Sequence, residues 1–216
     1  MSYNAVIFDL DGTLLDTLKD LSSSVNYALK HFGYPLHTTE EIRGYVGNGM
    51  QKLIERSLPA GASEAAVKEC LSVFSEYYLL HMSDYTAPYP GILPLLLHLK
   101  AQGIRLAIVS NKMDAAVKEL KEHYFSSLID IACGTPPDKK KPDPFCVMEA
   151  VSSLQVPLSG CVYVGDSHVD VETARNAGIP CIGVTWGFAG KEALSLCEPD
   201  YLVDTPEEIS ALISSK

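Results

Sequence analysis

Long apolar runs are absent from the sequence, and no stretch approaches the ~18 consecutive apolar residues that a membrane-spanning helix needs. Residues 1–4 also lack the basic region and the apolar core that open a secretion signal. We therefore expect no membrane partner and a cytoplasmic location.

Positive charge is scarce, because 27 Asp and Glu residues outnumber 17 Lys and Arg residues and give a formal net charge of -10. An acidic protein surface repels nucleic acids and anionic membranes. The basic run at residues 139–141 is too short to reverse this balance. We therefore expect no nucleic-acid partner.

Closely spaced cysteine pairs are missing too. None of the six cysteines belongs to a Cys-x-x-Cys motif, and several stand in apolar segments. This distribution favours buried, reduced thiols over a disulfide framework or a zinc site, and it fits a reducing compartment. The cysteines stand at positions 70, 133, 146, 161, 181 and 197.

The chain has enough length and apolar content for a sizeable core. With 216 residues, 47% of them hydrophobic, it can form one large domain or one domain with a smaller one inserted. After a first predicted strand, residues 17–85 show three helical patterns and no strand. Such a segment resembles a separate helical unit more than a crossover between parallel strands, and Asp16 and Tyr85 are candidate hinges.

The remaining chain alternates between strand and helix patterns, which predicts an α/β fold with a parallel sheet. Apolar, β-branched segments predict strands, and segments with helical periodicity lie between them. The predicted strands are 104–109, 128–132, 161–164, 181–185 and 201–203, and the predicted helices are 92–102, 114–123, 142–154 and 169–177.

The first predicted strand, Ala5–Phe8, leads directly into two carboxylates, Asp9 and Asp11. A solvated Asp-Gly turn at a strand end is the simplest interpretation of such a pair. A calcium-binding EF-hand loop does not fit, because Thr13 and Leu14 occupy the positions that need an oxygen ligand and a glycine. If the two carboxylates are buried, they require a cation, a proton or strong donors nearby.

Polar side chains also follow a later strand, and in open α/β sheets functional residues lie beyond the carboxyl ends of strands. Ser110 and Asn111 follow the strand at 104–109, and both can donate to a phosphoryl oxygen. A helix cap or a turn is an equally good explanation of these two residues alone. Lys141 precedes Pro142 at a predicted helix start, where its ammonium group could offset the aspartates and bind a phosphate.

The strand at 161–164 ends in Gly165-Asp166, which places a carboxylate where a metal shared with Asp9 could be held. Asp170 follows one helical turn later and could face the same site or cap a helix. A serine-hydrolase nucleophile elbow does not fit Ser167, because Val169 stands where that motif needs glycine.

The chain resembles the haloacid dehalogenase superfamily, most of whose members are Mg-dependent phosphatases. Its four motifs match in order along most of the chain. The resemblance implies a Rossmann-like, doubly wound parallel sheet of strand order 3-2-1-4-5. It also implies a catalytic core of residues 1–16 and 86–216, with a helical cap of residues 17–85 inserted after the first strand. The matching motifs are Asp9-x-Asp11-Gly12-Thr13, Ser110, Lys141-Pro142 and Gly165-Asp166-Ser167-x-x-Asp170.

The resemblance implies a role for each of these side chains. Asp9 would attack phosphorus and form an aspartyl phosphate, and Asp11 would act as the general acid and then the general base. Asp9, the Asp11 carbonyl and Asp166 would hold Mg²⁺. The phosphoryl oxygens would be stabilised by Ser110, Lys141 and backbone amides. Asp170 would be a supporting residue that orients Lys141 or a metal-bound water.

A glycine-rich segment in the predicted cap is the candidate for substrate selection. Arg43, Gly47, Asn48 and Gly49 belong to it, and an ordinary helix break is the competing interpretation. The segment resembles the cap loop of phosphoglycolate phosphatases, and its free amides, with Arg43 nearby, could receive a small anionic group. We therefore expect a small phosphorylated metabolite as substrate.

Other interpretations remain open from the sequence. β-Phosphoglucomutase and pyrophosphatase relatives also keep the residue equivalent to Asp11 and differ mainly in the cap. A receiver-like phosphoacceptor or a regulatory binding module represents a different class, but a receiver places its acceptor on a later strand and has no inserted cap. The expected assembly is a monomer or a homodimer.

Overall fold

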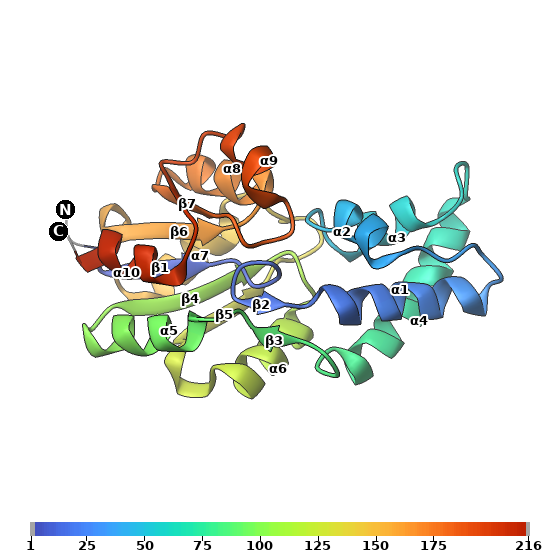
Figure 1. The fold of residues 1–216 in the computed structure, drawn as a ribbon, viewed down its shortest axis with the longest axis horizontal. Helices are drawn as coiled ribbons and strands as arrows, with labels where there is room; N and C mark the ends of the chain where they lie inside the picture. The colour runs from blue at the N-terminus through green and yellow to red at the C-terminus, as the bar shows by residue number, and fades with distance from the viewer. Residues whose placement is uncertain (1–2, 215–216) are drawn as a thin grey trace.

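Six parallel strands form the central sheet of the structure, a computed structural model that describes residues 3–214 (Figure 1). Numbered along the chain, these strands have the order 3-2-1-4-5-6. The predicted 3-2-1-4-5 order is therefore confirmed, with the last strand added at one edge. The strands, from edge to edge, are β5 (Ile131–Gly134), β4 (Arg105–Ser110), β1 (Ala5–Phe8), β6 (Cys161–Gly165), β7 (Cys181–Val184) and β8 (Tyr201–Val203).

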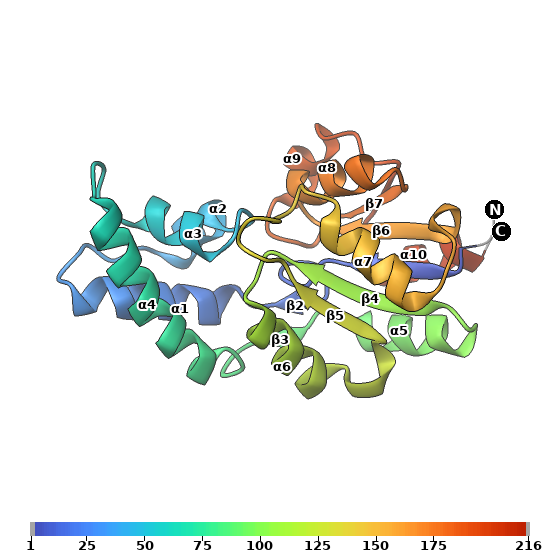
Figure 2. The ribbon, with the colours of Figure 1, turned by 180° about the vertical axis from the view of Figure 1, so that it is seen from behind.

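β1 is apolar throughout because helices cover both faces of the sheet (Figure 2). Val6 and Phe8 pack into the core on one face, and Ala5 and Ile7 pack into the core on the other. The face of Val6 is covered by α5 (Ile92–Ala101), α6 (Asp114–Tyr124) and α10 (Pro206–Ser214), and the opposite face by α7 (Phe145–Leu154), α8 (His168–Ala177) and α9 (Gly190–Ser195).

Four further helices lie together at one end of the molecule, beyond the sheet (Figure 1). Two short strands, β2 (Leu15–Asp16) and β3 (Ala87–Pro88), connect this group to the sheet and pair with each other in antiparallel orientation. The connections into and out of the helical group therefore run side by side. The four helices are α1 (Leu18–His31), α2 (Thr39–Tyr45), α3 (Met50–Ser57) and α4 (Glu64–His81).

Asp20, buried at the start of α1, ties the two connections together. Its carboxylate accepts hydrogen bonds from the backbone amides of Tyr85 and Thr86 and from the Thr86 hydroxyl, at 2.8–3.1 Å. The segment that leaves the helical group is therefore fixed to the first turn of the helix that enters it. Tyr85, a candidate hinge, lies within this contact.

The segment before α7 differs from the prediction. The helix expected to begin at Pro142 begins at Phe145, whose backbone amide donates to the Asp143 side chain at 2.9 Å. Pro142 instead lies in a turn, and its peptide bond with Lys141 is cis. Lys141 is therefore held by a loop and not by a helix start.

The strand expected at 128–132 begins later, at Ile131. A short 3₁₀ helix, Ser126–Leu128, occupies its predicted first residue, and Asp130 binds the backbone amide of Leu106 and the ammonium group of Lys100. Among residues 3–214 no helix has the length and apolar character required to cross a bilayer.

Candidate active site

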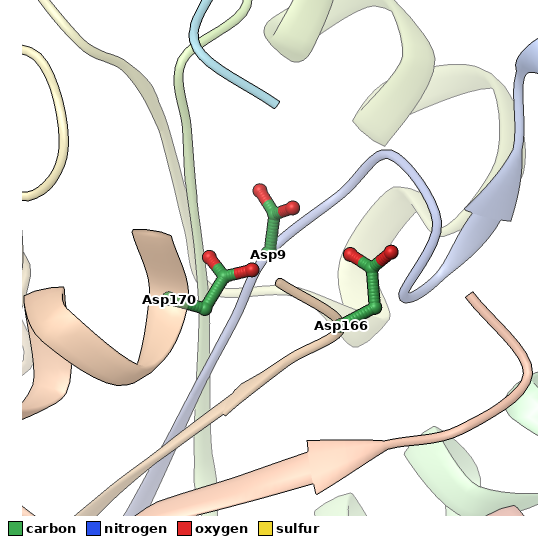
Figure 3. Close-up of side chains that lie close together, drawn as sticks. All are labelled: Asp9, Asp166 and Asp170. Atoms are coloured by element: carbon green, nitrogen blue, oxygen red, sulfur yellow. The ribbon is translucent and has the colours of Figure 1, made fainter. Parts of the chain in front are cut away.

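The carboxyl ends of β1 and β6 and the first turn of α8 bring the predicted acidic residues together. Because β1 pairs with both β4 and β6, Asp9 leaves the sheet between Ser110 and Asp166. Carboxylate oxygens of Asp9, Asp166 and Asp170 all lie within 4.8 Å of one another, and Figure 3 shows the three groups converging. Side chains far apart in the sequence therefore form one acidic cluster.

Asp9 lies at the centre of this cluster and is 7% exposed. Its Oδ1 accepts a hydrogen bond from Nζ of Lys141 at 2.7 Å. Burial, reinforced by Asp170 and Asp11, raises the pKa of Asp9 to about 7 against the opposing attraction of Lys141. The attraction of Lys141 therefore does not fully offset the burial of Asp9 and its carboxylate neighbours.

Asp166 contacts no cationic side chain within hydrogen-bond distance in the described chain. Its carboxylate accepts from the Phe188 amide at 2.7 Å and from the Thr13 hydroxyl at 3.3 Å. Burial, with Asp170 and Asp9 nearby, holds the pKa of Asp166 well above its usual value. Gly12, with φ of +83°, passes so close that a Cβ atom there would lie 2.5 Å from Oδ2 of Asp166.

This donor set fits a divalent cation. With all three carboxylates ionised, they and the Lys141 ammonium group sum to a charge of -2, from -3 and +1. Oxygen ligands of this kind are those that Mg²⁺ prefers. Asp9 and Asp166 are the residues available to hold it, since Asp170 uses one oxygen for Lys141 and the other for Ser167.

Lys141 is the cationic centre of the site and is 5% exposed. Its Nζ donates to Asp9 and Asp170 at 2.7 Å each, and to the Tyr163 hydroxyl at 3.1 Å. Burial alone would lower the pKa of Lys141, but the two carboxylates raise it well above the ordinary value. Asp170 therefore orients Lys141 in this structure.

Tyr163, on β6, was not predicted as a site residue, because it lies within an apolar strand segment and carries no sequence signal of its own.

Asn111 holds the main chain of Lys141. Its Oδ1 accepts from the Lys141 amide at 2.8 Å, and its Nδ2 donates to the Lys141 carbonyl at 3.2 Å. The Thr135 hydroxyl also donates to Oδ1 at 2.8 Å. The Asn111 side chain is thus engaged in fixing the loop, and its contact with a phosphoryl oxygen stays a prediction. Ser110, the last residue of β4, is buried beside Asn111 in the sequence.

Asp11 has two partners that sequence reasoning did not assign. The Thr17 hydroxyl donates to its Oδ1 at 2.6 Å, and Nζ of Lys112 lies 2.8 and 2.9 Å from its two oxygens. Lys112 is 1% exposed. Its position directly after Ser110 and Asn111, at the end of β4, was the available signal.

A cavity of about 470 Å³ lies between these strand ends and the helices α2 and α3. The predicted residues Arg43, Gly47, Asn48 and Gly49 all line it, together with Asp9, Asp11, Ser110, Asn111, Lys141 and Asp166. Arg56, which was not predicted, also lines it and donates to Oδ1 of Asn48 at 2.7 Å and to the Tyr45 carbonyl at 2.8 Å. The glycine-rich segment is therefore held over the acidic cluster by an arginine.

Comparison with known proteins agrees with this geometry. The model of the family described as haloacid dehalogenase-like hydrolase matches residues 6–184. A phosphoglycolate phosphatase of Vibrio parahaemolyticus is 32% identical over 217 residues, which cover 97% of this chain and 95% of that protein.

Solved structures show the same fold. A protein of Lactobacillus delbrueckii subsp. bulgaricus, provisionally named phosphoglycolate phosphatase, has a TM-score of 0.94 and 36% identity over 100% of both chains. CbbY from Rhodobacter sphaeroides, solved in complex with phosphate, has a TM-score of 0.78 and 26% identity, with 97% of this chain and 96% of that one covered. The resemblance inferred from four short motifs is confirmed, and the chain belongs to the haloacid dehalogenase-like hydrolase family.

Proposed function

We propose that the protein is a Mg²⁺-dependent phosphatase that hydrolyses a small phosphomonoester through a phosphorylated Asp9. The observation that carries this proposal is the convergence of Asp9, Asp166 and Lys141 at the floor of one cavity. The family membership and the similarity to proteins named phosphoglycolate phosphatase support it.

The proposed reaction has two steps. An Asp9 oxygen bonds to phosphorus while the bond from phosphorus to the ester oxygen breaks, and Asp11 donates a proton to that leaving oxygen. Water then attacks the phosphorus of the aspartyl phosphate, Asp11 accepts a proton from the water, and the bond to Asp9 breaks. Ser110 and Lys141 line the cavity where the transferred phosphoryl oxygens would be stabilised.

Asp9, Asp166 and the Asp11 carbonyl are the groups proposed to hold Mg²⁺. When bound, the ion neutralises charge on the nucleophile and on the phosphoryl oxygens. It would also relieve the repulsion within the acidic cluster.

Removal of metal tests this assignment in two ways. We expect chelation with EDTA to abolish hydrolysis of p-nitrophenyl phosphate and added Mg²⁺ to restore it. We also expect Mg²⁺ to raise the Tm of the parent protein and to have a much smaller effect on Asp166→Asn, because the variant lacks a carboxylate ligand. Undiminished hydrolysis after chelation, or an equal Tm increase in both proteins, would contradict the metal site.

The substrate that we propose is phosphoglycolate or another small phosphorylated acid. Arg43 and Arg56 line the cavity on the side of the helical insertion, across from the acidic cluster. Arg43 is paired with the exposed Glu40 at 3.3 Å, and Arg56 fixes Asn48. A substrate with a phosphate at one end and a carboxylate at the other matches cationic groups at both ends of this cavity.

Replacing Asn48 tests the substrate proposal. Asn48→Ala removes the 2.7 Å hydrogen bond that Asn48 accepts from the Arg56 guanidinium. The substitution therefore loosens the glycine-rich segment, which is proposed to bind the carboxylate end of the substrate. We expect kcat/KM for phosphoglycolate to fall ~10-fold or more, and that for p-nitrophenyl phosphate to fall much less, because the lost interactions lie far from phosphorus.

A neighbouring variant provides the control for Asn48→Ala. Gln51→Ala removes an exposed side chain of α3 that binds Glu55 and does not line the cavity, so neither substrate should be affected. Equal losses on both substrates in Asn48→Ala would make the loop structural. A preference for sugar phosphates or pyrophosphate in the parent protein would favour the β-phosphoglucomutase-like or pyrophosphatase alternative.

A further inference from the structure

Lys112 is a buried cation for which the proposed reaction has no role. It lies two residues beyond the end of β4, and its ammonium group has one carboxylate partner, Asp11, at 2.8 and 2.9 Å. A buried ion pair interacts strongly because little water screens it, and removing one partner leaves an uncompensated charge. The Asp11 carboxylate is therefore fixed by Lys112 on one side and by the Thr17 hydroxyl at 2.6 Å on the other.

The same ammonium group contacts the helical insertion. Its Nζ lies 4.6 Å from the ring centroid of Tyr78, a fully buried residue of α4. The Tyr78 hydroxyl also interacts with the Lys112 charge, although it is the one buried side-chain oxygen or nitrogen within residues 3–214 that makes no hydrogen bond of standard geometry. The ring of Tyr78 therefore supplies a cation–π contact from the helical insertion to Lys112.

We propose that Lys112 is a positioning residue that holds the Asp11 carboxylate in place for proton transfer, and that Tyr78 couples this pair to the helical insertion. The proposal rests on the function proposed above, in which Asp11 moves the proton. Without Lys112, the Asp11 carboxylate would keep only the hydrogen bond from Thr17, and one hydrogen bond leaves a carboxylate free to rotate. Because Tyr78 belongs to α4, the geometry of Asp11 depends on how the insertion packs on the sheet.

This role predicts a dependence on the leaving group. An alkyl phosphate such as phosphoglycolate expels a strongly basic oxygen that needs the proton from Asp11, whereas p-nitrophenyl phosphate expels a weakly basic one. A purely structural role of Lys112 would impair both substrates equally.

The test measures the phosphorylation step alone, by rapid quench, with both substrates in the full-length protein. We expect Lys112→Met to slow this step ~10²-fold with phosphoglycolate and less than ~5-fold with p-nitrophenyl phosphate. In the Asp11→Asn background, we expect Lys112→Met to cause no additional loss, because a residue that acts through Asp11 has nothing left to position. Lys118→Met, which removes an exposed lysine paired with Asp114 on α6, is the control.

Variants of Tyr78 test the coupling while every charged group is kept. Tyr78→Leu removes the ring over Lys112, and we expect the same leaving-group dependence as for Lys112→Met, at a smaller magnitude. Tyr78→Phe deletes the hydroxyl but keeps the ring 4.6 Å from the Lys112 ammonium group, so it should retain more of the phosphoglycolate reaction than Tyr78→Leu. If Lys112→Met fails to fold, the difference in leaving-group dependence between Tyr78→Leu and Tyr78→Phe tests the proposal.

The outcomes separate this inference from the proposed function. Equal losses on both substrates, no loss, or a full additional loss in the Asp11→Asn background would overturn the role of Lys112. Equal rates for Tyr78→Leu and Tyr78→Phe would overturn the coupling to α4. Failure of the parent protein to form a phosphorylated intermediate with either substrate would instead overturn the function on which the inference rests.

Discussion

Replacing Asp9 by Asn should lower kcat by at least ~10³-fold while the protein remains folded. The amide is nearly the same size as the carboxylate but is not a nucleophile, so no phosphoryl transfer can start. Lys141 keeps its contacts with Asp170 and Tyr163, and the amide has no charge to repel the neighbouring carboxylates. Single-turnover kinetics and circular dichroism measure the two parts of this prediction.

An exposed aspartate provides the control for this substitution. Asp138→Asn removes a charge from the loop that leads to Lys141 and should leave turnover at the parental level. A single-turnover rate of Asp9→Asn close to that of the parent would exclude Asp9 as the nucleophile.

Lys141→Met should impair both catalysis and stability. The variant loses the ammonium group that stabilises transferred oxygens, for which a loss of ~10²–10³ in kcat is typical. It also leaves the buried carboxylates of Asp9 and Asp170 without their cation, which costs about 3–5 kcal/mol in the free energy of unfolding. Urea denaturation and steady-state kinetics measure the two effects.

Added Mg²⁺ should recover part of the stability of Lys141→Met, because a divalent ion in the acidic cluster replaces some of the lost positive charge. Lys139→Met is the matched control, since Lys139 is a half-exposed neighbour whose ammonium group lies 3.5 Å from Asp143. Parental turnover in Lys141→Met, or equal destabilisation by the two substitutions, would contradict the central position of Lys141.

The sheet and the acidic residues could be predicted from the sequence because the relevant signals are local. An apolar strand followed by a carboxylate is visible at Asp9 and at Asp166 without knowledge of the fold. Parallel packing then places both residues at the same edge of the sheet. The structure confirms the strand order and brings these carboxylates together.

Partners separated along the chain could not be predicted in this way. The Lys112 contact with Asp11 joins positions 101 residues apart, and the Asn111 contact with Lys141 joins positions 30 apart. Neither pairing leaves a local pattern, because a lysine or an asparagine after a strand is compatible with a solvated turn. The late start of α7 has a local cause. The Asp143 side chain accepts a hydrogen bond from the Phe145 amide, so the helix begins at Phe145 and not at Pro142.

The most direct test of the central claim is to trap the phosphorylated enzyme. A rapid acid quench of the parent protein with Mg²⁺ and phosphoglycolate, followed by peptide mass spectrometry, should find one phosphoryl group on Asp9. This signal should form and decay at rates compatible with kcat, and it should be absent from Asp9→Asn. Release of phosphate in the first turnover with no covalent phosphate on the protein, or with the phosphoryl group on a residue other than Asp9, would contradict the account.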